Sequence, residues 1–276
     1  MLKKGISIWA FKDTPVKECI KLAKSSGYDG IELALNETGE ASLDSTEKEL
    51  LEYKKLAEDI GIEIPSVATG LYWKYGYTSN SPEIRNKAKD ITKKQLETAA
   101  ILGADTILVV PGACGVDFVP NSEIISYDLA YERAYAALSQ LKVEVDNFKV
   151  SIGVENVWNK FLLSPLEMRD FIDSLNNKYI GSYFDVGNVV YSGYPEHWIR
   201  ILGNRIKKLH FKDFKRSIGT LSGFVPLLEG DVNFPEVIKA LAEINYTSYV
   251  TGELFPDQSA DIVADTSVAM DKILGR

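Results

Sequence analysis

Hydrophobic residues along the chain follow two alternating spacings, and this alternation predicts a repeated strand–helix unit. A short apolar run, typical of a buried strand, is followed each time by a segment whose apolar residues recur every three or four positions, as on one face of a helix. In the first unit, the run at 5–10 is followed by apolar residues at Val16, Cys19, Ile20 and Ala23. Glycine or proline separates many of these segments, as expected for turns between elements.

Eight units of this kind follow one another without a linker-like or low-complexity segment between them. The expected strands are residues 5–10, 30–35, 62–68, 106–110, 150–157, 180–184, 206–211 and 249–255. The expected helices are residues 16–25, a helix capped by Asp44 or Ser45 that ends at Ile60, 82–102, 124–148, 165–175, a short helix after Pro195, 234–244 and 262–273. This pattern is that of a closed parallel barrel, so the expected fold class is α/β, a single (β/α)8 TIM barrel formed by residues 1–276 as one catalytic domain.

Composition and charge restrict the classes of partner. The chain has 276 residues, of which 45% are hydrophobic and 25% charged, so a large core can be buried. Its formal net charge of -8 argues against nucleic acid as the main partner, because binding a phosphate backbone normally needs a basic face. A local basic pocket for a single phosphate is compatible with this charge. Two cysteines do not make a disulfide framework, and no segment approaches the roughly 20 apolar residues of a membrane span. A cytoplasmic protein that does not enter the membrane is therefore expected.

Four potential metal ligands lie at or near the ends of expected strands. They are Glu155 in GVENVW, Asp185 in FDVGN, His210 in LHFKD and Glu253 in GELF. The carboxyl ends of the strands in a parallel barrel converge on one face, where enzymes of this architecture have their sites. Three carboxylates and an imidazole suit Mn²⁺, Mg²⁺ or Co²⁺. Taken singly, these residues are also explained by a surface ion pair, a turn cap or a core histidine, but their shared location favours a metal enzyme.

Two further groups of residues are candidates for ligand contacts. The loop at 69–81 carries the aromatic residues Tyr72, Trp73, Tyr75 and Tyr77. This loop suits either the wall of a substrate pocket or a contact with a neighbouring subunit. Basic residues expected on loops at the same end of the barrel either bind a phosphate or are solvated charges: Lys74, Lys160, Lys212, Lys215 and Arg216.

In their order along the chain, the motifs GVENVW, FDVGN, LHFKD and GELF resemble the xylose-isomerase-like TIM-barrel sugar isomerases and epimerases. The resemblance is greatest to the ketose 3-epimerases and the pentulose- and hexulose-phosphate 3-epimerases. It implies that Glu155, Asp185, His210 and Glu253 bind one divalent metal ion, with Mn²⁺ as the first choice and Mg²⁺, Co²⁺ or Zn²⁺ as alternatives. It also implies that Glu155 and Glu253 act as the acid/base pair.

The same resemblance assigns residues to the substrate. Arg216 lies six residues after His210, which is the spacing of a substrate-binding arginine in the ketose 3-epimerases. Those enzymes have a histidine three residues after the metal-binding aspartate, whereas this chain has Asn188, so its recognition of sugar hydroxyls is expected to differ. Independently of the resemblance, Trp73 from the aromatic loop and the basic residue Lys212 complete the expected substrate-binding set. The relatives also imply a homo-oligomer, either a dimer or a tetramer.

The expected reaction is 3-epimerisation or aldose–ketose isomerisation of a small-molecule sugar or sugar phosphate. A proton leaves the carbon beside a carbonyl, a metal ion stabilises the resulting enediolate, and two carboxylates on opposite faces of the substrate exchange the proton. The alternatives are an inosose-dehydratase-like or hydroxypyruvate-isomerase-like enzyme with the same metal site, or a catalytically silent sugar-binding barrel.

Overall fold

Among residues 1–259 and 261–276, which the computed structural model describes, eight parallel strands close into a barrel. The strands are β1 (Lys3–Ser7), β2 (Gly30–Ala34), β3 (Ser66–Ala68), β4 (Thr106–Val109), β5 (Ser151–Glu155), β6 (Ile180–Asp185), β7 (Ile206–Phe211) and β10 (Tyr249–Gly252). They pair around the barrel in the order β1-β10-β7-β6-β5-β4-β3-β2. The predicted (β/α)8 TIM barrel is therefore confirmed.

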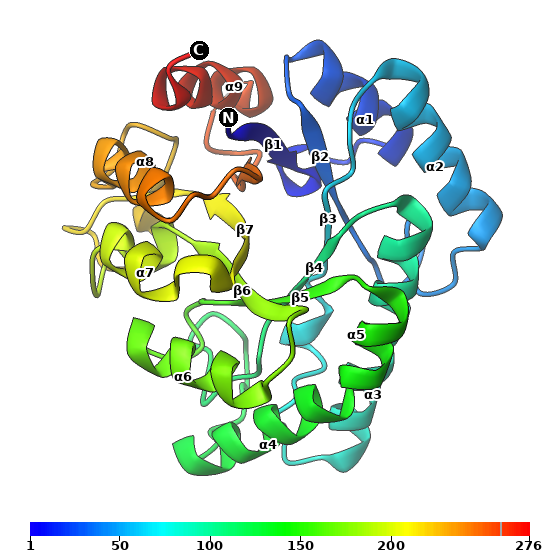
Figure 1. Ribbon diagram of the computed structural model, residues 1–276, viewed down its shortest axis with the longest axis vertical. Helices are drawn as coiled ribbons and strands as arrows, with labels where there is room; N and C mark the ends of the chain where they lie inside the picture. Colours follow the sequence, from blue (N-terminus) through cyan, green and yellow to red (C-terminus); the bar gives the residue numbers. More distant parts are fainter. Residues whose placement is uncertain (260) are drawn as a thin grey trace.

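Helices connect successive strands and surround the barrel (Figure 1). They are α1 (Val16–Ser25), α2 (Glu47–Ile60), α3 (Pro82–Leu102), α4 (Tyr127–Gln140), α5 (Lys142–Phe148), α6 (Pro165–Leu175), α7 (Pro195–Leu202), α8 (Phe234–Glu243) and α9 (Ile262–Leu274). In α2, for example, the buried residues Leu50, Tyr53 and Ala57 recur at helical spacing and face the barrel. Gly61 ends this helix in the left-handed conformation, with φ of 71°.

Two expected boundaries near the N-terminus were wrong. β1 ends at Ser7, and the following residues Ile8–Ala10 form a 3-10 turn instead of continuing the strand. The first turn of α2 is capped by Thr46, not by Asp44 or Ser45. The Thr46 hydroxyl accepts a hydrogen bond from the backbone N–H of Glu49, which has no acceptor within the helix.

Other apolar segments are longer than the elements that they contain. β3 begins only after Pro65, which has no N–H to donate to a sheet. Val110 and Leu254 lie beyond the ends of β4 and β10, yet only 3% and 1% of their surface is exposed. The helix expected at 124–148 is two helices, α4 and α5, which meet at the buried Leu141. An apolar run in the sequence thus marks the residues that are buried, and these extend beyond the residues that form a regular strand or helix.

A hairpin that the apolar pattern did not predict follows β7. Its strands, β8 (Asp213–Phe214) and β9 (Phe224–Val225), pair antiparallel. The Asp213 carboxylate accepts backbone N–H groups from its own strand and from the loop at 230–232, which holds that loop against the hairpin. One aromatic ring from each strand packs against Trp158, in the loop after β5. The hairpin therefore covers one side of the carboxyl end of the barrel.

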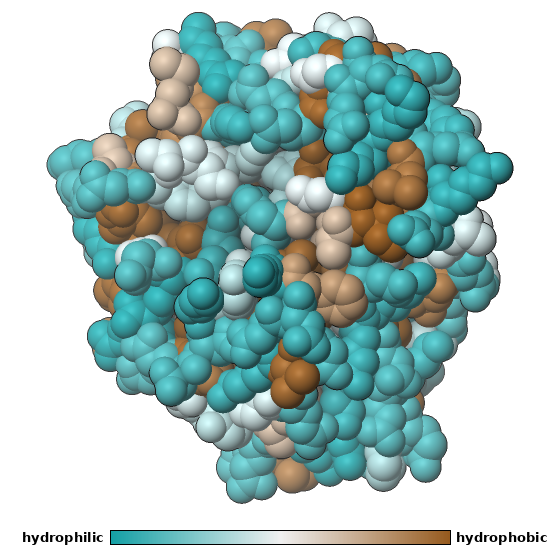
Figure 2. All heavy atoms as spheres, turned by 45° about the vertical axis from the view of Figure 1, so that its right-hand side comes forward, coloured by the Kyte–Doolittle hydropathy of each residue, from teal (hydrophilic) through white to brown (hydrophobic). Residues whose placement is uncertain are grey.

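The ends of the chain and its surface complete the description. The two termini lie close together (Figure 1), and the Arg276 guanidinium donates a hydrogen bond to the Leu2 carbonyl at 2.7 Å. On the face shown in Figure 2, hydrophilic residues cover most of the surface, and hydrophobic residues form separate patches. Within the described parts of the chain, no helix is both long enough and apolar enough to cross a membrane.

Candidate metal centre

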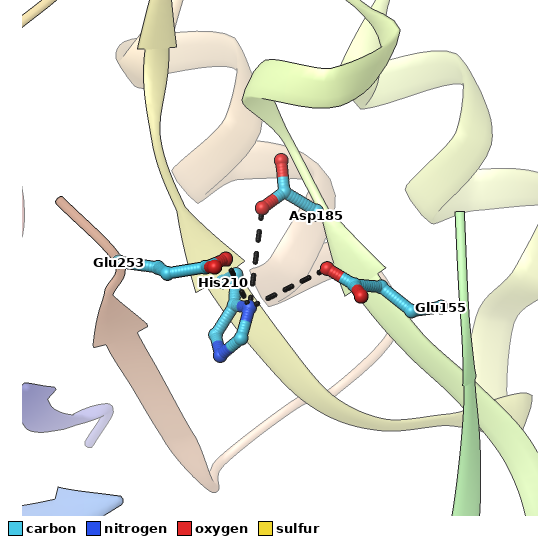
Figure 3. A group of neighbouring side chains, drawn as sticks. All are labelled: Glu155, Asp185, His210 and Glu253. Carbon is cyan, nitrogen blue, oxygen red and sulfur yellow. Dashed lines mark ion pairs between the residues drawn. The ribbon is translucent and has the colours of Figure 1, made fainter. Parts of the chain in front are cut away.

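The structure brings the four predicted metal ligands together at the carboxyl end of the barrel (Figure 3). Glu155 ends β5, Asp185 ends β6, His210 lies near the end of β7, and Glu253 directly follows β10. These strands are neighbours in the barrel, and Asp185 and His210 are paired directly in the sheet. The four side chains are buried, and one ligand atom from each lies within 4.8 Å of the others.

The ligand atoms of this group fit a divalent cation. His210 Nδ1 lies 2.7 Å from Glu253 Oε2, 3.7 Å from Glu155 Oε1 and 4.0 Å from Asp185 Oδ2. Within the described residues, His210 Nδ1, Asp185 Oδ2 and Glu253 Oε2 are buried without an aligned hydrogen-bond partner, and the Lys212 ammonium forms ion pairs with the two carboxylates only. Electron-rich atoms that face one another in a buried space are unfavourable unless a positive charge lies among them. Carboxylates together with an imidazole suit Mn²⁺, Mg²⁺ and Co²⁺, so the residues present match such an ion.

Lys212 places a positive charge beside these carboxylates. Its Nζ lies 2.6 Å from Glu253 Oε2 and 3.3 Å from Asp185 Oδ2, and its side chain is 10% exposed. Gly187, in the motif FDVGN, makes room for it, because a Cβ at that position would lie 2.5 Å from the Cβ of Lys212. One ammonium and one divalent ion together balance three carboxylates, so the cluster is neutral when both are in place.

Burial and neighbouring charges separate the pKa values of the two glutamates. Burial raises the pKa of Glu155 to about 7, against the opposing effect of the nearby His210. Burial also acts to raise the pKa of Glu253, but the positive charges of Lys212 and His210 outweigh it and lower that pKa to about 2. For His210, burial acts to lower the pKa, and the Glu32 and Glu253 carboxylates more than offset this and raise it. Two carboxyl groups with separated pKa values are suited to the roles of acid and base.

Two asparagines hold Asp185 in position. Asn156 Nδ2 donates to the Asp185 carbonyl at 2.8 Å, and Asn156 Oδ1 accepts the Asp185 N–H at 2.9 Å. The Asn188 N–H donates to Asp185 Oδ1 at 2.8 Å, which leaves Oδ2 facing the centre. Asn188 also lines a cavity of about 290 Å³. Asn188, predicted to bind substrate, thus contacts a candidate metal ligand directly.

The other predicted substrate-binding residues divide into two groups. Lys212 lies within the ligand cluster, whereas the described contacts of Trp73 and Arg216 are with other residues. Trp73 packs edge-on against Phe118, with ring centroids 5.1 Å apart, and lines a cavity of about 300 Å³. Arg216 is exposed, and its Nε donates to the Val190 carbonyl at 2.8 Å.

Glu32, which lies on β2 inside the barrel, is a residue of the site that the sequence pattern did not indicate. Its carboxylate is fully buried, and Oε1 lies 3.0 Å from His210 Nε2. A signal was present, because a carboxylate within the apolar run GIELAL needs a compensating partner if it is buried. Every residue of β2 is buried, however, so the sequence pattern does not indicate toward which partner the side chain points.

Comparisons with known proteins agree with this architecture. The family model described as "Xylose isomerase-like TIM barrel" matches residues 20–272. The putative L-ribulose-5-phosphate 3-epimerase SgbU of Escherichia coli K12 is 25% identical over 268 residues, which cover 92% of this chain and 88% of SgbU. The L-ribulose-5-phosphate 3-epimerase UlaE of Escherichia coli O157:H7 is 23% identical over an alignment of 292 positions, gaps included, which covers 100% of this chain and 96% of UlaE.

A solved structure shows the same fold. D-psicose 3-epimerase, crystallised in the presence of D-fructose, superposes with a TM-score of 0.82 and 18% sequence identity, and the match covers 100% of both chains. The two relatives and this structural neighbour carry the names of sugar epimerases, which are isomerases.

Proposed function

The chain belongs to the xylose isomerase-like TIM barrel family, and from this premise we propose that it is a divalent-metal-dependent 3-epimerase of a ketose or a ketose phosphate. The observation that supports this proposal most is the convergence of Glu155, Asp185, His210 and Glu253 at the carboxyl end of the barrel. The activity for which SgbU and UlaE are named makes L-ribulose 5-phosphate the first substrate to test.

In the proposed enzyme these four residues hold the ion, with Mn²⁺ as the first choice. When bound, the ion supplies Lewis-acid polarisation of the substrate carbonyl. Lys212, whose Nζ lies beside Glu253 and Asp185, donates a hydrogen bond to the substrate oxygen that gains negative charge when a proton is removed. The burial of the cluster excludes bulk water, which strengthens these electrostatic contacts.

Glu155 and Glu253 carry out the two proton transfers. Their strands, β5 and β10, are separated in the barrel by β6 and β7, and their carboxylates approach the centre from different sides (Figure 3). One carboxylate takes the proton from the carbon next to the carbonyl; the C–H electron pair forms a C=C bond, and the carbonyl oxygen becomes anionic. The other carboxyl group returns a proton to the opposite face. The configuration at that carbon is thereby inverted.

The remaining substrate contacts are assigned to loops at the same end of the barrel. Arg216 is proposed to bind the sugar, because its spacing from His210 matches the family pattern. Asn188, which stands where that pattern has a histidine, and Trp73, from the aromatic loop, are proposed to contact the sugar as well. For a phosphate group, Lys74 and Lys160 are the candidates. Each now forms an ion pair with an acidic residue, and both pairs are exposed. Exposed pairs of this kind are weak, so a phosphate can replace the carboxylate partner.

Exchange of solvent deuterium tests the proposal. The protein, reconstituted with Mn²⁺, is incubated in D₂O with L-ribulose 5-phosphate and, separately, with unphosphorylated ketopentoses and ketohexoses, and the products are followed by NMR. We expect one deuterium at C3 and the appearance of the C3 epimer. Deuterium at C1 together with an aldose would contradict epimerisation in favour of isomerisation. Absence of exchange with every ketose would contradict the enzyme proposal and favour a silent sugar-binding barrel.

A further inference from the structure

A layer of polar side chains lies inside the barrel directly beneath the candidate metal centre. Its central member is Glu32, whose surface is 0% exposed. The Glu32 carboxylate has three polar partners. Ser66 Oγ donates at 2.8 Å and the Tyr183 hydroxyl also donates, both to Oε2, while His210 Nε2 lies 3.0 Å from Oε1. A fully buried carboxylate is retained in a protein only with such compensation.

These contacts determine which nitrogen of His210 carries the proton. An ionised carboxylate only accepts hydrogen bonds, so the nitrogen that faces Glu32 has to donate. A neutral imidazole has one N–H, and with Nε2 as the donor, Nδ1 has a free lone pair. Nδ1 is the atom that lies 3.7 Å from Glu155 and 2.7 Å from Glu253. The tautomer inferred from this hydrogen-bond network is therefore the one that binds a metal ion.

The imidazole ring is also held against rotation. The Tyr183 ring packs on it, with ring centroids 4.5 Å apart and a tilt of 54° between the planes. Because the Tyr183 hydroxyl donates to the same carboxylate that accepts from His210, the two rings and Glu32 form a closed triangle. A flip of the imidazole would break its hydrogen bond with Glu32 and turn Nδ1 away from the other ligands.

We propose that Glu32 is a positioning residue for the metal centre: its carboxylate orients the His210 ring, selects the Nε2–H tautomer and increases the electron density at Nδ1. This inference rests on the proposed metal site and adds a residue from β2 to it. Hydrogen-bond partners of metal-binding histidines typically contribute 10–100-fold to metal affinity. An alternative role is purely structural, in which Glu32 only completes hydrogen bonds inside the barrel. The two roles predict different effects on metal affinity.

The test is the affinity for Mn²⁺ of three purified metal-free proteins, measured by titration calorimetry, with thermal unfolding recorded alongside. In Glu32→Gln the amide retains the shape and the hydrogen-bonding capacity, because the Tyr183 and Ser66 hydroxyls can accept from it, but the charge is lost. We expect Mn²⁺ to bind about 10–100-fold more weakly to this variant. Ser66→Ala is the matched control, since Ser66 donates to the same carboxylate without touching His210. We expect its Kd to stay within about threefold of the wild-type value.

The outcomes separate the two roles. A Glu32→Gln variant that is folded and binds Mn²⁺ as tightly as the wild type would overturn the proposal and leave Glu32 with a structural role only. If Glu32→Gln does not fold, Glu32→Asp takes its place: it keeps the charge but withdraws the carboxylate from His210, and an unchanged Kd would again overturn the proposal. A wild-type protein that does not bind Mn²⁺ or Co²⁺ would instead contradict the proposed metal centre itself, and that result is visible before any variant is compared.

Discussion

His210 Nδ1 and Glu253 Oε2 lie 2.7 Å apart in a buried space, and Lys212 Nζ lies 2.6 Å from the same oxygen. The two residues come from neighbouring strands, β7 and the end of β10, so the barrel itself fixes their separation. The raised pKa of His210 favours a proton at this contact in the metal-free protein, and a divalent ion bound among the ligands would take the place of that proton.

Glu155→Gln and Glu253→Gln are each expected to lower the rate at which the C3 epimer forms by at least about 10²-fold, because inversion needs both proton transfers and an amide carries out neither. The rate is measured by NMR at saturating Mn²⁺, and bound metal is determined in the same samples. Glu63→Gln is the control, since Glu63 pairs with Lys3 at an exposed position. A near-normal rate in either variant would remove that glutamate from the mechanism.

Removal of the metal is expected to lower the melting temperature. Ligand binding at about 100 times Kd stabilises a folded protein by about 2.7 kcal/mol, which corresponds to roughly 5 °C or more for a chain of this size. Differential scanning calorimetry with chelator, and then with excess Mn²⁺, measures the change. An identical melting temperature in both conditions would indicate that the folded state does not bind the ion.

Lys212→Met is expected to destabilise the metal-free protein by about 3 kcal/mol. The substitution leaves two buried carboxylates, Asp185 and Glu253, without their ammonium partner. Mn²⁺ supplies positive charge at the same carboxylates, so the difference from wild type should shrink when the metal is added. Urea unfolding with and without Mn²⁺ checks this. A variant that is equally destabilised in both conditions would argue against shared neutralisation by Lys212 and the ion.

The stability of the metal-free protein is expected to fall as the pH rises from 5 to 8. The pKa of Glu155 is raised to about 7 in the folded state, so the folded protein holds a proton that the unfolded chain releases near pH 4.5. The raised pKa of His210 acts in the same direction. The lowered pKa of Glu253 contributes stability that is lost only at more acidic pH. The free energy of unfolding is expected to fall by up to about 3 kcal/mol between pH 5 and 8. Urea unfolding at several pH values measures it. A free energy of unfolding that rises across this range would contradict the raised pKa of Glu155.

Arg216→Ala is expected to raise KM about tenfold or more while leaving the Kd for Mn²⁺ unchanged, because Arg216 is assigned to the substrate and makes no described contact with the metal ligands. Steady-state kinetics and calorimetry provide the two values. An unchanged KM would show that Arg216 is a surface charge held by the Val190 carbonyl.

The apolar pattern was sufficient to predict the barrel, since each strand is buried and each helix presents one apolar face. It was less informative about boundaries. Val110 and Leu254 are buried although they lie outside the strands. Their hydrophobic side chains therefore extended the predicted strands beyond the true ends. The β8–β9 hairpin was not predicted because its strands, at 213–214 and 224–225, are too short for any periodicity.

The candidate ligands were identifiable because a polar residue at the end of an apolar run marks the carboxyl face of a parallel barrel. Glu32 was not identifiable as a site residue, because it lies in the middle of the apolar run at 30–35 and its partners Tyr183 and His210 are far away in the sequence. The role of Gly187 likewise depends on contact with Lys212, which only the packed structure shows.

The central claim is that three carboxylates and one imidazole hold a divalent ion at the mouth of the barrel. Anomalous diffraction from crystals of the protein grown with Mn²⁺ tests it most directly. The account predicts one strong anomalous peak in contact with Glu155, Asp185, His210 and Glu253. A peak elsewhere, or a peak in contact with only one or two of these four residues, would contradict it.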